Sequence, residues 1–237
     1  MKNNGEINNK IIPSILNVPL PEDNKKEYEI LRKLVEKEEL SNEEEKKVED
    51  MSNQLINKLR EHEEQKSILY AVHLIKNGFE TRKIFQIIGW KGFEKVTAIL
   101  LESLDANVFS NFRFKTILGE KREIDILAFR RPIVLSIDCK NWLRKGSHTY
   151  GLRQAAKQQK QRTLELFDIF PEISAYTPLK YWKKAFLIPL VVSSLDHDLI
   201  VENDVLIVPL SGLGKLINEI LSHEELFSLK WENGFYY

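Results

Sequence analysis

The chain has 237 residues, of which 43% are hydrophobic, and its 35 basic residues balance its 35 acidic residues. This apolar content at zero net charge excludes an intrinsically disordered chain, and a single cysteine excludes a disulfide framework or a zinc ribbon within one chain. The longest apolar run, 185–192, is too short to span a bilayer, and the first ten residues lack the apolar core of a secretory signal. We therefore expect a cytoplasmic protein without a membrane partner.

The zero net charge conceals an uneven distribution of charge along the chain. Residues 1–66 carry a net charge of −4 and residues 185–237 carry −6. Residues 107–184, in contrast, contain 16 basic and 7 acidic residues, a net charge of +9. A basic block suits a polyanionic partner, because each neutralised phosphate releases counterions. A solvated basic face without a partner is the alternative interpretation.

The N-terminal third favours a helical extension. Residues 1–22 show no sustained period and are interpreted as a loose arm. Apolar residues then recur at helical spacing, and Ser41 followed by Glu44 predicts a capping box at the start of a second helix. The amphipathic pattern of these first two helices makes a homodimer a hypothesis. We expect 23–89 to form the extension.

Two short helices inside this extension are predicted at 67–76 and 82–88, and glycine follows each of them. Short helices joined by a tight glycine turn resemble a helix-turn-helix. A structural unit of three packed helices is the alternative. A third helix is expected from about Gly92 to Asp105.

After Asp105 the hydrophobic period changes from helical to alternating. The sequence predicts five strands, at 108–118, 123–129, 132–138, 185–192 and 205–210. Helices are expected at 150–170 and 211–221. This order predicts an α/β fold for 90–237, with a mixed central sheet flanked by helices on both faces.

Three polar residues interrupt two neighbouring apolar strands. Asp125 lies inside one strand, and Asp138 and Lys140 end the next on the same face, because strand side chains alternate. Burial of two carboxylates is unfavourable unless they bind a cation or pair with one, and Mg²⁺ prefers oxygen ligands. An Asp/Glu-x-Lys triplet occurs five times in the chain, but only 138–140 ends an apolar strand. A structural ion pair at a sheet edge is the alternative.

These residues resemble the PD-(D/E)xK nuclease superfamily, whose restriction-endonuclease-like fold also includes archaeal endonuclease-like proteins and Holliday-junction resolvases. The resemblance covers about 90–222. Its motifs are Gly92-Phe-Glu94 on a helix, Glu123-Ile-Asp125 on a strand, and Asp138-Cys-Lys140 at the end of the next strand. Ile124 stands where the family pattern has a proline.

The resemblance implies a restriction-endonuclease-like domain that hydrolyses DNA phosphodiester bonds with Mg²⁺, for which Mn²⁺ would substitute. Asp125 and Asp138 would hold the metal, with the Cys139 backbone carbonyl as a further ligand. Lys140 would position or activate the attacking water, and Glu94 would complete the site. A non-catalytic nucleic-acid-binding protein on the same fold and an RNA-processing nuclease remain alternatives.

Two other carboxylates are weaker candidates for the metal site. Glu123 lies two residues before Asp125 and therefore shares its face in a regular strand. Glu102 lies two helical turns after Glu94.

Residues after the lysine are candidates for binding DNA, whether branched or duplex. Trp142 can stack a base or sugar, or pack under a loop. Gln154 or Gln158 can hold a ligand water or a phosphate oxygen, and an ordinary polar helix face is the alternative. The full set of nucleic-acid-binding candidates is Trp142, Arg144, Lys145, Arg153, Gln154, Lys157 and Gln158.

Overall fold

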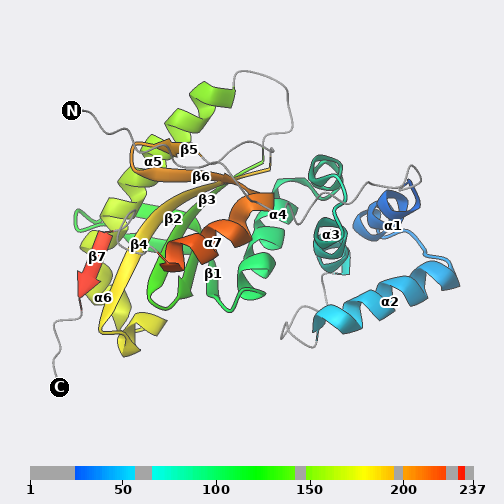
Figure 1. Cartoon of the computed structure of the whole chain (residues 1–237), viewed down its shortest axis with the longest axis horizontal. Coiled ribbons are helices and arrows are strands. Elements are labelled where there is room, and N and C mark those ends of the chain that lie inside the picture. The colour runs from blue at the N-terminus through cyan, green and yellow to red at the C-terminus, as the bar shows by residue number, and fades with distance from the viewer. Residues whose placement is uncertain (1–24, 57–65, 142–147, 195–199, 223–228, 233–237) are drawn as a thin grey trace, which may run out of the picture.

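A computed structural model describes residues 25–56, 66–141, 148–194, 200–222 and 229–232. A twisted central sheet with helices on both faces forms the larger part of the molecule, and the N-terminal helices form a lobe at one end (Figure 1). The predicted mixed α/β fold with an N-terminal helical extension is therefore confirmed. Within the described ranges, no helix is both long enough and apolar enough to cross a membrane.

The α-helices, in chain order, are α1 (Lys25–Glu36), α2 (Asn42–Ile56), α3 (Lys66–Lys76), α4 (Thr81–Glu102), α5 (His148–Asp168), α6 (Phe170–Ser174) and α7 (Leu213–Ser222). The strands are β1 (Asn107–Lys115), β2 (Lys121–Arg130), β3 (Ile133–Lys140), β4 (Lys184–Ser193), β5 (Ile200–Glu202), β6 (Val205–Pro209) and β7 (Leu229–Glu232).

The sheet is mixed and has the strand order β1-β2-β3-β4-β6-β5, with β7 also paired to β4. β1, β2 and β3 form an antiparallel meander, whereas β3, β4 and β6 run parallel to one another. The α5 and α6 segment provides the crossover from β3 to β4. β5 and β7 have three and four residues, so neither is long enough to give a clear alternating pattern in the sequence.

Pro189 lies in the middle of the buried strand β4, where a missing N–H would normally break a ladder. On one side of β4, β7 pairs with residues 184–187 and β6 pairs with residues 190–193. Pro189 falls in the gap between these two partners, so the strand tolerates a residue that cannot donate a hydrogen bond.

Two helical layers cover the sheet. The α4 and α7 side chains pack with one face of β2, β3, β4 and β6, where Ile126, Ile137 and Cys139 are buried. The α5 and α6 side chains pack on the other face, against Leu127 and Val134 among others. The site predicted at the end of β3 therefore lies between α4 and α5.

The N-terminal lobe is built from α1, α2 and α3: α1 and α2 both pack on α3, and α1 and α3 pack on α4 (Figure 1). The predicted capping box is present, since the Ser41 N–H donates to Glu44 Oε2 at 2.8 Å and the Glu44 N–H to Ser41 Oγ at 3.3 Å. Ile30, Leu31 and Met51 are buried in the same core as α4. These side chains of α1 and α2 are thus covered within the chain, whereas Val35 of α1 is exposed.

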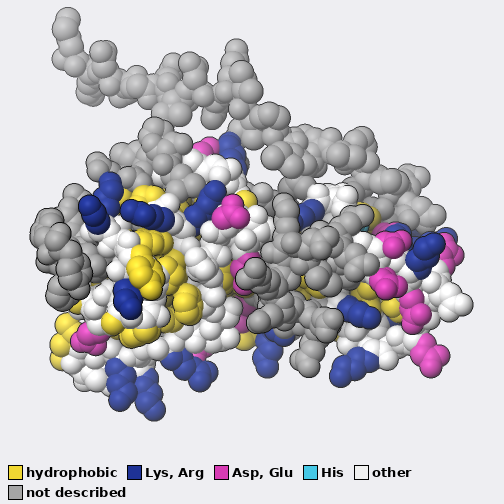
Figure 2. Space-filling view, turned by 90° about the horizontal axis from the view of Figure 1, so that it is seen from below, with side chains coloured by type: hydrophobic (Ala, Val, Ile, Leu, Met, Phe, Trp, Pro, Cys, Tyr) yellow, Lys and Arg dark blue, Asp and Glu magenta, His cyan; other side chains and the backbone are white. Residues whose placement is uncertain are grey.

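Surface charge differs between the two ends of the molecule. Acidic side chains, interleaved with Lys and Arg, gather over the end formed by α1 and α2, whereas Lys and Arg predominate over the sheet half of the same face (Figure 2). Ion pairs such as Arg32 with Glu29 at 2.7 Å neutralise part of the acidic end. The charge that is unevenly distributed along the sequence is therefore also unevenly distributed over this face of the molecule.

Helix α4 is kinked at Gly89, which has φ 70° and ψ −170° and separates 81–88 from 90–102. This combination of angles is essentially restricted to glycine. The kink folds Ile88 over Gly92, where an added Cβ would lie 2.7 Å from the Ile88 Cβ atom. The sequence correctly placed the helix break at Gly89, and the helix resumes at Trp90.

We expect Gly89→Ala to lower the free energy of unfolding by about 1–3 kcal/mol, the range for a non-glycine residue forced into such a conformation. No atom lies within 4 Å of the added methyl, so backbone strain alone would cause the loss. Urea unfolding measures it, with Gly214→Ala in α7 as the matched control, since its Cβ meets only Leu104 Cδ1 at 3.9 Å. Equal stability of the Gly89 variant and the wild type would contradict the strain.

Candidate active site

Strands β2 and β3 separate at the candidate site. Their ladder ends at the pair Ile126 and Ile137, so the next two residues, Asp125 and Asp138, lie opposite each other without ladder pairing. β3 nevertheless continues beside β4 as far as Lys140. The Cys139 N–H, which has lost its β2 partner, donates instead to Asp125 Oδ2 at 2.8 Å. The Asp125 side chain thus completes the hydrogen bonding of a strand end.

The neighbouring strand β1 is irregular at the same level. Asn111 has a positive φ of 52° and faces Asp125, and the β1–β2 pairing omits both residues. On β2, Ile124 packs toward α5 whereas Ile126 packs toward α4, so the regular alternation of side chains breaks at Asp125. Alternation therefore cannot relate Glu123 to Asp125, and Glu123 pairs instead with Arg113 at 2.7 Å.

The Asp138 carboxylate is the buried centre of the site. It is 1% exposed, and Arg162 Nη2 donates to its Oδ1 at 2.7 Å. The Lys140 ammonium donates to Oδ1 at 3.1 Å and lies 2.8 Å from Oδ2, although only the contact with Oδ1 has hydrogen-bond geometry. A buried carboxylate requires such compensation.

Helix α5 anchors this arrangement on the face of β3 that carries Ser136 and Asp138. Gln159 is fully buried, and its Nε2 donates to the Ser136 carbonyl at 2.6 Å and to Ser136 Oγ at 2.9 Å. The Thr163 hydroxyl donates to the same Ser136 Oγ at 3.0 Å. These contacts fix the rotation of α5 on β3 and so bring Arg162 to Asp138.

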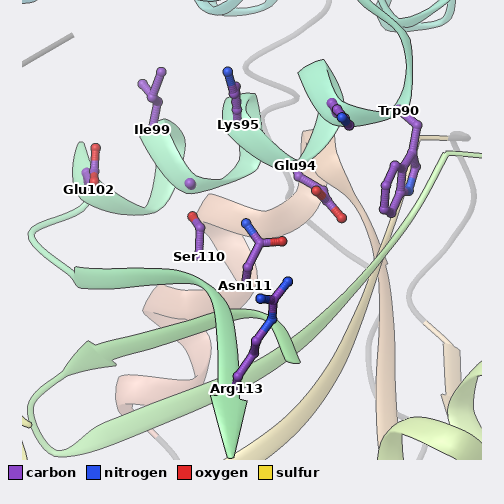
Figure 3. A pocket seen from close by; sticks show the side chains of 10 residues that line it. Trp90, Glu94, Lys95, Ile99, Glu102, Ser110, Asn111 and Arg113 are labelled. Carbon is purple, nitrogen blue, oxygen red and sulfur yellow. The ribbon is translucent and has the colours of Figure 1, made fainter. Parts of the chain in front are cut away.

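Glu94 approaches the carboxylates from α4 on the opposite layer. In Figure 3 its carboxylate points from α4 toward the strands. Burial raises the pKa of Glu94 to about 7, and the negative charges of Asp125, Glu123 and Asp138 add to the rise while Lys140 opposes it. Glu94 therefore lies near enough to these three carboxylates for their charges to act on it.

The pKa values of Asp125 on β2 and of Cys139 on β3 are also raised. Burial raises the pKa of Asp125, the Cys139 N–H partly offsets this, and Asp138 adds to the rise. Burial raises the pKa of the Cys139 thiol well above its ordinary value, so the thiol stays protonated in the core. Cys139 is thus a core residue whose backbone, rather than its sulfur, belongs to the site.

The carboxylates of the site are ligands of the type that binds a hard cation, although they are not already arranged around a metal position. Among the described residues, no three His, Cys, Asp or Glu side chains are arranged to hold a metal ion as they stand. Asp138 Oδ2, however, is buried and accepts no hydrogen bond within the described structure. This oxygen, which lies 2.8 Å from the Lys140 ammonium without hydrogen-bond geometry, is a ligand of the type that Mg²⁺ takes.

The structure describes four of the seven predicted nucleic-acid-binding residues. Trp142, Arg144 and Lys145 lie outside the described residues. The remaining four, on α5, are exposed, and they are Arg153, Gln154, Lys157 and Gln158. Arg153 lies 3.6 Å from a carboxylate oxygen of Glu202.

Sequence reasoning missed Arg162 and Gln159 as residues of the site. Both lie on the face of α5 that contacts the sheet, together with Ala155, Ala156 and Thr163. The small and apolar residues at spacings of three and four mark that face in the sequence. This pattern would have selected Gln159 rather than its exposed neighbour Gln158.

We expect Glu94→Gln to stabilise the metal-free protein, and to do so more at pH 8.5 than at pH 5. Because the folded-state pKa of about 7 exceeds the ordinary 4.5, ionisation of Glu94 increasingly disfavours the folded state as pH rises between these values. The Tm difference between variant and wild type measures this effect in chelator-containing buffer. Glu219→Gln on α7 controls for the loss of one exposed carboxyl, and an equal Tm difference for Glu94→Gln at both pH values would contradict the expectation.

Residues 88–192 match the family model of the nuclease-related domain, NERD. No curated protein and no solved structure matches the chain. The matched segment contains all four predicted catalytic residues, Glu94, Asp125, Asp138 and Lys140. The match is consistent with a nuclease of the PD-(D/E)xK type and indicates a nuclease-like function for this part of the chain.

Proposed function

We propose that the protein is a metal-dependent endonuclease that hydrolyses DNA phosphodiester bonds. The observation that carries this proposal is the position of Asp138 and Lys140 at the end of β3, beside Asp125 at the separation of β2 from β3. Glu94 approaches the same point from α4. Two carboxylates and a lysine converging in a nuclease-related segment are the groups that metal-assisted hydrolysis of a phosphodiester requires.

Asp125 and Asp138 would hold the metal ion, and Glu94 would complete its surroundings directly or through water. The N–H and C=O of a strand residue point to the same side, so the Cys139 carbonyl lies on the Asp125 side, where its N–H already donates. The carbonyl is thus a further candidate ligand. When bound, Mg²⁺ would polarise the phosphate and lower the pKa of a water.

Lys140 supplies a partly exposed cation at the same point. Its side chain is partly exposed, whereas its partner Asp138 is buried. The lysine therefore reaches from the carboxylate toward solvent, where a substrate phosphate would arrive. There the ammonium would orient the attacking water and stabilise negative charge developing on the phosphate. Arg162 would remain on Asp138 and keep its carboxylate compensated when Lys140 moves.

A polyanionic substrate is supported by the charge around the site. The segment 107–184, with its net charge of +9, includes β1, β2, β3 and α5. The choice of DNA over RNA follows the resemblance to the nuclease superfamily, since phosphodiester chemistry is shared by both. The alternative functions, an RNA-processing nuclease or a non-catalytic nucleic-acid-binding protein, are outcomes of the tests below.

We expect Asp138→Asn and Lys140→Ala each to lower Mg²⁺-dependent DNA cleavage by at least about 100-fold, the scale on which a group acting in the transition state contributes. The assay uses purified protein with linear, branched, flapped and single-stranded DNA, and the corresponding RNA strands. Circular dichroism verifies that the variants fold.

The matched controls are Asp204→Asn and Lys215→Ala, which alter exposed residues paired with Lys160 and Glu219. These two variants should cleave like the wild type. Full activity in both site variants would overturn the assignment. Cleavage of RNA strands alone would move the activity to RNA, and binding without cleavage by the wild type would favour the non-catalytic module.

Metal binding should be measurable without catalysis. We expect isothermal titration with Mn²⁺ to show a site in the wild type and in Asp204→Asn, and a loss of at least about tenfold in affinity in Asp138→Asn. The reason is that a neutral amide replaces a buried carboxylate, one oxygen of which accepts no hydrogen bond within the described structure. Unchanged Mn²⁺ affinity in Asp138→Asn would remove Asp138 from the metal site.

A further inference from the structure

A cleft of about 720 Å³ opens between α4 and the edge strand β1, next to the candidate active site. In Figure 3 side chains of α4 lie along one side of it and those of β1 point up from the other. This volume is in the range of ligand sites. Glu94 belongs to both the cleft and the candidate active site. It lines the cleft, and the negative charges of Asp125 and Asp138 raise its pKa.

Trp90 presents an open aromatic face in this cleft. Its side chain is 52% exposed, although it lines the cleft. It is the first residue of α4 after the kink at Gly89, and it lies one helical turn before Glu94. Figure 3 shows the indole beside the Glu94 carboxylate, both directed from α4 toward the strands.

Two unneutralised cations accompany the indole. Lys91 and Lys95 are exposed, line the cleft and are one helical turn apart. Neither forms an ion pair with any residue in the described part of the chain. Arg113 also lines the cleft, but Glu123 already holds its guanidinium.

Carboxylates in the same cleft argue against a site that binds phosphate alone. Glu94 and Glu102 repel anions, so the two lysines do not create a strongly positive channel. An aromatic face adds an attraction that does not depend on charge, because base–aromatic stacking contributes about 1–3 kcal/mol per base. Aromatic and cationic groups together suit a nucleotide, which offers both a base and phosphates.

We propose that the cleft between α4 and β1 binds an unpaired nucleotide of the polynucleotide substrate, with its base stacked on Trp90 and its flanking phosphates on Lys91 and Lys95. This inference rests on the proposed function, since Glu94 belongs to both the cleft and the candidate active site. Bases within an intact duplex stack on their own neighbours, so only an unpaired base can offer its face to the indole. Strands that are single, frayed or branched near the scissile bond are the substrates that this cleft fits.

Binding of labelled oligonucleotides, measured by fluorescence anisotropy in EDTA, tests the subsite without any cleavage. We expect the wild type to bind a 12-nucleotide oligo-dT more tightly than a blunt 12-base-pair duplex. Trp90→Ala should weaken oligo-dT binding by about 5- to 100-fold, and Trp90→Phe should lose less because it keeps a ring. The double variant Lys91→Gln, Lys95→Gln should bind with a weaker dependence on salt. The slope of log affinity against log salt concentration should become shallower by about one for each lost phosphate contact.

Two controls are matched to these variants. Tyr181→Ala removes an aromatic side chain that is 77% exposed on another part of the surface, and Lys215→Gln removes an exposed lysine from α7. Both should bind oligo-dT like the wild type. Wild-type affinity in Trp90→Ala, or equal wild-type affinity for duplex and oligo-dT, would overturn the proposal.

Failure of the subsite and failure of the nuclease assignment give different results. Asp138→Asn should lose cleavage but retain oligo-dT binding, because it leaves the cleft unchanged. Cleavage by the wild type together with wild-type binding in Trp90→Ala would overturn the subsite alone. A parallel titration with oligo-U and oligo-dU, which share the base, distinguishes the sugar: tighter binding of the ribose strand that depends on Trp90 would support the subsite and overturn the assignment to DNA.

Discussion

The arrangement of the site depends on one buried carboxylate. Asp138 is 1% exposed at the carboxyl end of a central strand, where an uncompensated charge would be strongly unfavourable. Lys140 compensates it from the same strand and Arg162 from α5. The second of these contacts requires α5 to lie on β3 in one rotation, and the buried Gln159 supplies that constraint through Ser136. The crossover helix is thus part of the site as well as part of the core.

Separation of β2 from β3 allows two layers of the fold to contribute to one point. A continuous sheet would isolate α4 from α5, because side chains on its two faces do not meet. The ladder ends at Ile126 and Ile137, and Asp125 and Asp138 follow in the gap. Glu94 then acts on the cluster from the α4 layer while Arg162 contacts it from the α5 layer. The main-chain N–H freed by the gap is satisfied by Asp125, so the opening leaves no orphaned donor at Cys139.

Sequence patterns predicted the mixed sheet with its flanking helices and the shared face of Asp138 and Lys140, because each follows from a local period. Three features escaped prediction for physical reasons. The contact of Arg162 depends on the rotation of α5, which tertiary packing decides. The altered alternation at Asp125 lies opposite the positive φ of Asn111, so it involves two strands at once and no period within one strand reveals it. The cleft beside Trp90 arises between elements whose spacing no local pattern encodes.

The kink in α4 has a consequence for how chains with this fold can diverge. Gly89 allows the bend, and the bend places Ile88 where any side chain at Gly92 would collide with it. The two glycines should therefore vary together in evolution. In a relative whose helix is straight at position 89, position 92 can carry a side chain. A relative that keeps the bend must keep both. Covariation at these two positions would thus show whether the Glu94 segment has kept its angle to the sheet, independently of whether the side chains of the candidate site persist.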